Sequence, residues 1–181
     1  LTGLGLTFPI VSIIMAFTLL LGQGGAPLFS IARGEGDTKK ASRILGNSFV
    51  MLLIGSVVLT LSGYILMRPI LYALGASDAS YVYASDYLKI YLIGTVFTML
   101  ATGLNFYITA EGFPKTAMIT VLSGAVLNIG LDPVFIFALG MGIRGAAVAT
   151  VISQAVSCAW VLWFLLSPRA IIRLNKSSMI L

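Results

Sequence analysis

The sequence contains no histidine, a single cysteine and few charged residues, and each shortage excludes a class of protein. Without histidine, the familiar metal-binding and general-base arrangements lack their commonest side chain. The one cysteine, Cys158, lies inside an apolar run, so the sequence holds no disulfide framework. Charged residues make up 9% of the chain, whereas an ordinary soluble domain carries about 25%. Because no nucleophile–base pair or metal-ligand set is evident, an enzyme is the least favoured class and we expect no cofactor.

Long apolar runs take the place of these missing groups. Four stretches carry no charged residue, and a fifth is interrupted only by Asp132. A helix that crosses a bilayer needs about 20 apolar residues, and five such runs in succession cannot all be buried in one soluble core. We therefore predict an all-α integral membrane protein in contact with the lipid bilayer. Its five transmembrane helices are expected at about 4–32, 44–67, 86–110, 116–139 and 145–167.

The net charge of +5 could suggest nucleic acid, but no basic stripe with interleaved aromatic residues is present, and we expect no such partner. The basic residues lie instead in the loops between the apolar runs. Eight fall on one side of the expected membrane, namely Arg33, Lys39, Lys40, Arg43, Lys115, Arg169, Arg173 and Lys176, against Arg68, Lys89 and Arg144 on the other. Cytoplasmic loops carry the excess of Lys and Arg, so the first side is predicted to be cytoplasmic and the N-terminus external.

Asp132 is the most informative residue of the sequence. A charged side chain at the bilayer centre costs about 2.5–3.5 kcal/mol on insertion scales, and such residues usually face a bundle interior or a water-filled cavity. Asn128 precedes it by four residues and shares its helix face. Pro133 lacks a backbone donor and disfavours a helical conformation at Asp132, which should free a carbonyl group one turn earlier.

Thr150 should lie close to Asp132 in depth. Counted from the outer ends of two consecutive antiparallel helices at 1.5 Å per residue, Asp132 is about 10 Å deep and Thr150 about 8 Å. Oxygen ligands of this kind suit Na⁺, while burial of a carboxylate favours its protonated form and so suits H⁺. The alternative is that Asp132 only caps a half-helix or bonds Asn128 for packing. Asn105 is a weaker candidate because direct contact with Asp132 would need a bend.

Other polar residues have simpler interpretations. Gln23 and Gln154 are expected to hydrogen-bond between helices. The tyrosines near the external loop indicate an interfacial aromatic belt; they are Tyr64, Tyr72, Tyr81, Tyr83 and Tyr87.

Five motifs are spread over nearly the whole chain. They are GEGDTKKASR (34–43), LGAS followed by YASDYLKI (74–90), ITAEGFPKTAM (108–118), NIGLDPVFIF (128–137) and GIRGAAVATVISQ (142–154). No single motif is decisive, but in this order the set resembles the MATE transporters, the multidrug and toxic compound extrusion antiporters.

The resemblance implies twelve helices in two six-helix lobes related by a pseudo-two-fold axis. Residues 1–168 would be helices two to six of the N-terminal lobe, and residues 169–181 the start of the cytoplasmic linker between lobes. The partners would then include helix one and the C-terminal lobe of the same polypeptide, and the fragment should not transport alone. The location implied is the plasma or inner membrane of a prokaryotic cell, crossed several times.

The resemblance also implies a site. The family's N-lobe cation site uses an Asp on helix one, which lies outside this sequence, with an Asn and an Asp on helix five and a Thr on helix six. The matching positions are Asn128, Asp132 and Thr150, with Asn105 in the same polar network and Ala146 offering its backbone carbonyl. The function implied is export of cationic drugs in exchange for H⁺ or Na⁺.

Two other functions stay open. One is a flippase for lipid-linked oligosaccharides or peptidoglycan precursors from the same superfamily, which would need a cationic lining to hold pyrophosphate. The other is a membrane scaffold that does not transport, in which Asp132 only contributes to packing.

Overall fold

The computed structural model describes residues 2–179, which form long helices joined by short turns, with no strand in that range. The α-helices are α1 (Thr2–Gly5), α2 (Phe8–Gly34), α3 (Thr38–Ala73), α4 (Asp78–Ile93), α5 (Thr95–Ala110), α6 (Pro114–Pro133) and α7 (Ile143–Leu166). A π-helical turn, η1 (Val134–Ala138), extends α6, and a 3₁₀ turn, η2 (Lys176–Ser178), follows α7.

The helices have the length and the surface of membrane spans. Within the described residues, α2, α3, α7 and α6 with η1 are each long and apolar enough to cross a bilayer, and the bent pair α4 and α5 is a fifth when it is counted as one span. Large apolar side chains cover much of the outside, with Phe137 80% and Ile65 75% exposed. Such a surface is stable only against lipid or other apolar partners. The predicted all-α membrane fold with five spans is confirmed.

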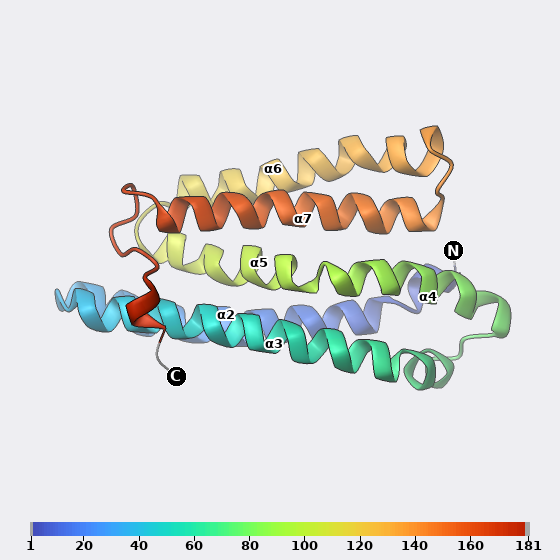
Figure 1. Cartoon of the computed structure of the whole chain (residues 1–181), viewed down its shortest axis with the longest axis horizontal. Helices are drawn as coiled ribbons and strands as arrows, with labels where there is room; N and C mark the ends of the chain where they lie inside the picture. The colour runs from blue at the N-terminus through green and yellow to red at the C-terminus, as the bar shows by residue number, and fades with distance from the viewer. Residues whose placement is uncertain (1, 180–181) are drawn as a thin grey trace.

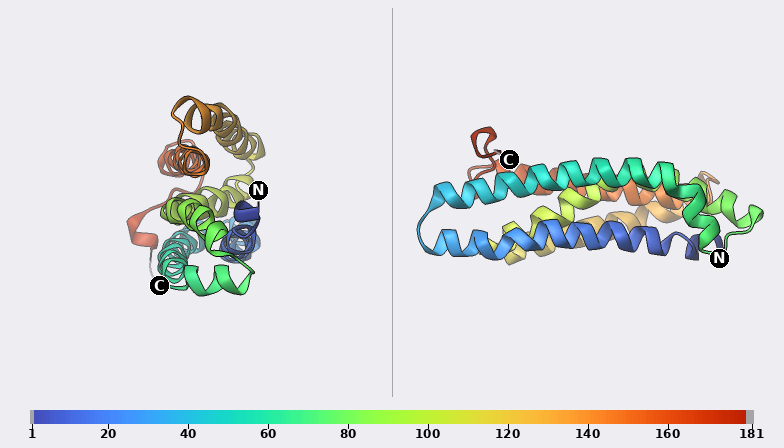
Figure 2. Two further views of the ribbon diagram at one scale, coloured as in Figure 1. Left: turned by 90° about the vertical axis from the view of Figure 1, so that its right-hand side faces the viewer. Right: turned by 90° about the horizontal axis from the view of Figure 1, so that it is seen from below.

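The bundle has two antiparallel helix pairs with α5 between them. Helices α2 and α3 form one pair, α6 and α7 form the other, and α5 packs against all four (Figure 1). The end-on view in Figure 2 shows α5 at the centre. Helix α4 packs mainly against α7, with smaller contacts to α3 and α1. The loops that carry most of the basic residues therefore lie together at one end, beside the turn between α5 and α6.

Glycine allows the close crossing of α2 and α5. A Cβ atom added at Gly22 would lie 2.6 Å from the Cα of Gly103, closer than atoms can approach without a shift. Small residues permit such contacts between membrane helices, which gain van der Waals energy from them. Nearby, Tyr107 of α5 shares a hydrogen bond of 2.5 Å with Ser48 of α3. Helices α2, α3 and α5 are thus fixed to one another near the basic end.

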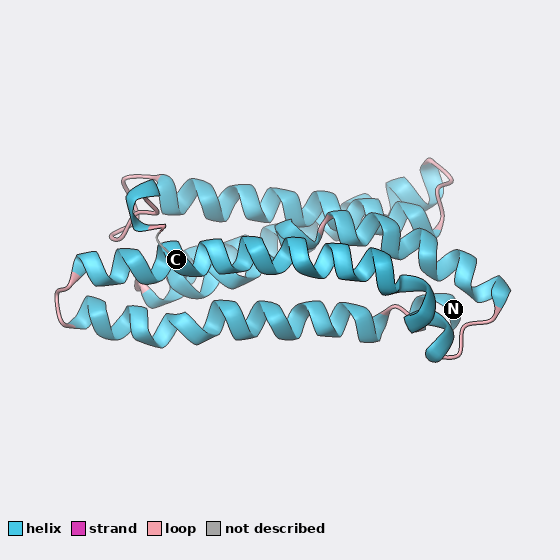
Figure 3. Ribbon diagram, turned by 60° about the horizontal axis from the view of Figure 1, so that its bottom comes forward, coloured by secondary structure: helices cyan, strands magenta, loops and turns pink. Residues whose placement is uncertain are grey.

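The span made by α4 and α5 bends by 55° at Gly94. Figure 3 shows that the chain is helical along most of its length, with short loops between the helices. A Cβ atom at Gly94 would lie 2.6 Å from Cγ2 of Val151 in α7, so the absence of a side chain lets α7 press into the bend. This contact aligns α4 with the part of α7 that contains Thr150.

The residues after α7 fold back onto the basic end of the bundle, where η2 lies against α3. Glu111, in the turn after α5, is only 1% exposed, and its carboxylate accepts hydrogen bonds from the backbone N–H groups of Ile171 (3.3 Å) and Ile172 (3.2 Å). Burial raises the pKa of Glu111, while these two hydrogen bonds and the nearby Arg33 oppose the rise. A linker beginning at residue 169 stays a prediction, but the start of this segment is held against the lobe.

Candidate functional site

Three of the residues singled out by the sequence lie together between α6 and α7. The amide Nδ2 of Asn128 donates to Oδ1 of Asp132 at 3.4 Å and to Oγ1 of Thr150 at 3.5 Å. The first contact is the one-turn pairing that the i, i+4 spacing predicts, and the second joins the two helices. All three side chains are half-buried.

The predicted carbonyl group is part of the same cluster. The hydroxyl of Thr150 donates to the backbone oxygen of Ala146, one turn earlier in α7, at 2.9 Å. This bond turns a lone pair of the Thr150 hydroxyl toward Asn128. The cluster therefore presents carboxylate, carboxamide, hydroxyl and carbonyl oxygens from two helices.

The prediction that Pro133 interrupts the helix at Asp132 is wrong. The α-helix continues through both residues, and Pro133 has helical dihedral angles of φ −59° and ψ −37°. The irregularity comes one step later, where residues 134–138 form a π-helix and the N–H of Leu139 bonds the oxygen of Val134. The wide turn follows the carboxylate directly and packs against α7, since a Cβ at Gly145 would lie 2.6 Å from the oxygen of Phe135.

Tyr87 joins this cluster, although the sequence placed it in the external aromatic belt. Its side chain extends from α4 toward Thr150 and Asp132. The ring also stacks on Tyr91, with centroids 5.7 Å apart. The bend at Gly94 places α4 against α7, and no local sequence pattern predicts that the two helices pack together.

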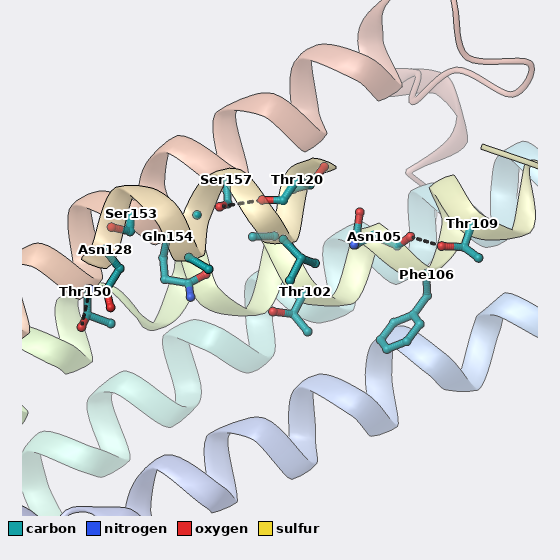
Figure 4. Close-up of a pocket in the computed structure, with 14 residues that line it drawn as sticks. Thr102, Asn105, Phe106, Thr109, Thr120, Asn128, Thr150, Ser153, Gln154 and Ser157 are labelled. Atoms are coloured by element: carbon teal, nitrogen blue, oxygen red, sulfur yellow. Dashed lines mark hydrogen bonds between the residues drawn. The ribbon is translucent and has the colours of Figure 1, made fainter. Parts of the chain in front are cut away.

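Asn105 does not contact Asp132. Its Nδ2 donates to the backbone oxygen of Ala117 in α6 at 3.1 Å, and its Oδ1 is buried without a partner among the described residues. It belongs instead to the wall of a cavity of about 430 Å³ between α5, α6 and α7, which Asn128 and Thr150 also line (Figure 4). Gln154 faces the same cavity, whereas Gln23 lines a second hollow between α2 and α5.

The chemistry available to the cluster is that of a single carboxylate among neutral oxygens. No group of three or more His, Cys, Asp or Glu side chains that could hold a metal ion occurs within residues 2–179. Hard oxygen donors with one negative charge suit a small monovalent cation or a proton better than a transition metal.

Comparison with known proteins gives one consistent result. The chain matches the MatE family over residues 1–134. It is 35% identical over 156 residues to the multidrug export protein MepA of Staphylococcus haemolyticus, covering 86% of this chain and 34% of that protein. It is 28% identical over 178 residues to the protein of the same name from Staphylococcus aureus, covering 96% of this chain and 39% of that protein.

Solved structures agree with this assignment. A multidrug resistance MATE family transporter in an inward-facing conformation superposes with a TM-score of 0.94 at 27% identity, over 99% of this chain and 41% of that one. An outward-facing structure of such a transporter gives 0.93 at 27% identity, over 100% and 40%. The chain thus spans about two-fifths or less of these relatives and fits both conformations equally well. It belongs to the MATE family and forms part of a multi-pass membrane protein.

Proposed function

We propose that the chain is part of one lobe of a secondary antiporter that exports cationic drugs or toxic organic compounds in exchange for H⁺ or Na⁺. The observation that carries the proposal is the contact of Asp132 with Asn128 and, through it, Thr150 inside the membrane-spanning bundle. A carboxylate in such a place usually marks an ion or proton pathway. The name of the MepA relatives, multidrug export protein, supports organic compounds as the exported class.

Ion binding would change the contacts between α6 and α7. In the structure, the amide N–H group of Asn128 points to both Asp132 and Thr150. A sodium ion needs oxygen ligands, so Asn128 would have to present its carboxamide oxygen instead. A proton on Asp132 would weaken the acceptor that the N–H group uses. Either ion therefore alters the bonds between the two helices.

Coupling needs two conformations that differ in their affinity for the ion. The chain resembles its counterparts in an inward-facing and an outward-facing transporter almost equally, which supports motion of the whole lobe rather than rearrangement within it. In the outward-facing state, an ion from outside would neutralise Asp132 and favour release of the cationic drug. The ion would then be released on the inside as the lobes rock.

The two rival functions have less support. A flippase for pyrophosphate-linked lipids needs cationic side chains in its cavity, and no charged residue lines the cavity between α5, α6 and α7. The scaffold function explains the bond between Asn128 and Asp132 but gives no role to the cavity that reaches the cluster.

The test is replacement of Asp132 by Asn in the full transporter, with export of ethidium measured in cells and in membrane vesicles. Asp78→Asn is the matched control, because Asp78 is exposed at the start of α4, where its carboxylate accepts a hydrogen bond from the hydroxyl of Tyr72. We expect D132N to lose ion-driven export at near-normal protein levels and D78N to retain it. Export by D132N at the wild-type rate would refute the proposal.

A further inference from the structure

Two tryptophans and an arginine meet at the end of α7 that lies beside the basic loops. Trp160 is 40% and Trp163 49% exposed, and their rings lie 5.5 Å apart. Trp163 precedes Leu166, the last residue of the helix, by one turn, which is roughly 5 Å along the axis. Tryptophan is enriched at the level of the lipid headgroups. The guanidinium of Arg169 lies over the Trp163 ring, 5.1 Å from its centre, so the pair places a cation at that level.

A second cation lies at the same edge of the bundle. Helix α6 begins where α7 ends (Figure 1), and Phe113 packs edge-to-face on Phe164 with ring centroids 5.3 Å apart. Lys115 follows Phe113 by two residues and is exposed, as is Arg169. Within the described residues, neither of these two charged groups forms an ion pair. Both charges therefore stay available to a ligand from outside the chain.

The carboxylates of the described residues leave this edge positively charged. The sequence after Glu111 contains one acidic residue, Asp132, which lies near the other end of α6, roughly 25 Å from Lys115. Glu111 itself is buried and accepts backbone N–H groups of the segment after α7. Glu35 and Asp37 belong to the turn between α2 and α3, where one makes an ion pair and the other caps a helix. The edge is thus complementary to an anion.

An apolar stripe runs along α7 away from Arg169. Four exposed apolar side chains recur at spacings of four, four and three residues and so share one face of the helix; they form the α7 stripe and are Ile152, Val156, Trp160 and Trp163. Contiguous exposed apolar groups of this kind mark contact with lipid or protein. A free anion in water makes no use of them, whereas a phospholipid carries an anionic phosphate above its acyl chains.

We propose that Arg169 and Lys115 bind the phosphate of an anionic phospholipid in the leaflet at the basic end, with its acyl chains covering the α7 stripe. Arginine can make two parallel hydrogen bonds to a phosphate, and its contact with the Trp163 ring leaves the N–H groups at the edge of the guanidinium free to do so. Lysine adds a compact charge beside it. The site needs no ion at Asp132 and goes beyond the proposed antiport.

Titration of the full transporter in detergent tests this site. The probes are dioctanoyl-phosphatidylglycerol, which is anionic, dioctanoyl-phosphatidylcholine, which has the same chains and no net charge, and inorganic phosphate. Dissociation constants are measured by microscale thermophoresis for the wild type, Arg169→Gln, Arg169→Lys and Trp163→Leu. The matched control is Lys39→Gln, because Lys39 is an exposed basic residue at the same end of the bundle but lies in the first turn of α3, with no aromatic ring against it among the described residues.

We expect R169Q to weaken phosphatidylglycerol binding about tenfold, W163L about threefold and K39Q less than about twofold, with R169K between the wild type and R169Q. Equal losses in R169Q and K39Q would show only diffuse attraction and overturn the site. Phosphatidylcholine bound as tightly as phosphatidylglycerol would also overturn it. Inorganic phosphate bound as tightly as the anionic lipid would assign the edge to a free anion instead. If the melting temperature shows that R169Q is not folded, Lys115→Gln replaces it, with an expected loss of about threefold.

Discussion

Replacing Glu111 with alanine removes the carboxylate that holds the segment after α7 against the bundle. The side chain is 1% exposed and accepts the N–H groups of Ile171 and Ile172, at 3.3 and 3.2 Å. Without it, two backbone donors lose their acceptor in a place that water reaches poorly, at a cost of about 1–3 kcal/mol each. Some water will enter the space, so we expect the docked segment to lose about 2 kcal/mol of local stability. At 1.4 kcal/mol per factor of ten, that is roughly a 30-fold change in opening.

Hydrogen exchange followed by mass spectrometry measures this opening directly in the detergent-solubilised transporter. Peptides that contain residues 170–174 should exchange about 30-fold faster in E111A, while peptides from α5 stay unchanged. The matched control is Glu35→Ala, because Glu35 is exposed and makes only a surface ion pair of 3.4 Å with Lys40. Unchanged exchange in E111A, or an equal increase in E35A, would show that Glu111 does not hold this segment.

Three further predictions follow from the same structure. Burial raises the pKa of Glu111 above its ordinary 4.5, so docking of residues 170–174 should be strongest below pH 4.5 and weaken as the pH rises through the raised pKa. Hydrogen exchange, corrected for its intrinsic dependence on pH, should show this weakening in the wild type and lose it in Glu111→Gln. Gly22→Ala should lower the melting temperature, because overpacking against Gly103 typically costs about 1–3 kcal/mol. Gly24→Ala should leave it unchanged, because a Cβ there meets open space among the described residues. Equal melting temperatures for the two variants would contradict the close crossing of α2 and α5. Thr150→Val should weaken the inhibition of drug binding by the ion several-fold, because it removes the hydroxyl that bonds Asn128 and Ala146, and Thr150→Ser should restore it. Wild-type inhibition in T150V would exclude the hydroxyl from the site.

The fold was predictable because its strongest determinant is local. Uncharged runs long enough to cross a bilayer can be counted along the chain, and the basic residues between them indicate which helix ends lie together. The turn between α2 and α3 also depends on local residues: Gly36 has a φ of 78°, and Asp37 caps α3 by accepting the N–H of Lys40 at 2.9 Å. The bend at Gly94 was not, since it depends on Val151 of another helix.

The candidate site was predictable where helical spacing decides the contact and not elsewhere. The pairing of Asn128 with Asp132 follows from their spacing of one helical turn. The similar depths of Asp132 and Thr150 on antiparallel helices predicted that Thr150 lies nearby. Tyr87 was missed because its contact needs the bend between α4 and α5. The effect of Pro133 was misplaced, because the α-helix continues through Asp132 and Pro133 and the π-helical turn begins only at Val134.

The role of Glu111 was missed for a different reason. In the sequence it is a charged residue in a loop beside a glycine and a proline, a pattern typical of a solvated turn. Only the return of residues 170–174 covers it, and a contact across about sixty residues leaves no local pattern.

The most direct test of ion coupling at Asp132 is the ion dependence of drug affinity at equilibrium. In the purified transporter, the dissociation constant of ethidium is measured across pH at fixed Na⁺ and across Na⁺ at fixed pH. The account predicts that affinity falls as the activity of one of the two ions rises, with a limiting logarithmic slope near one, and that D132N removes this slope. A flat response to both ions in the wild type, or an unchanged slope in D132N, would contradict it.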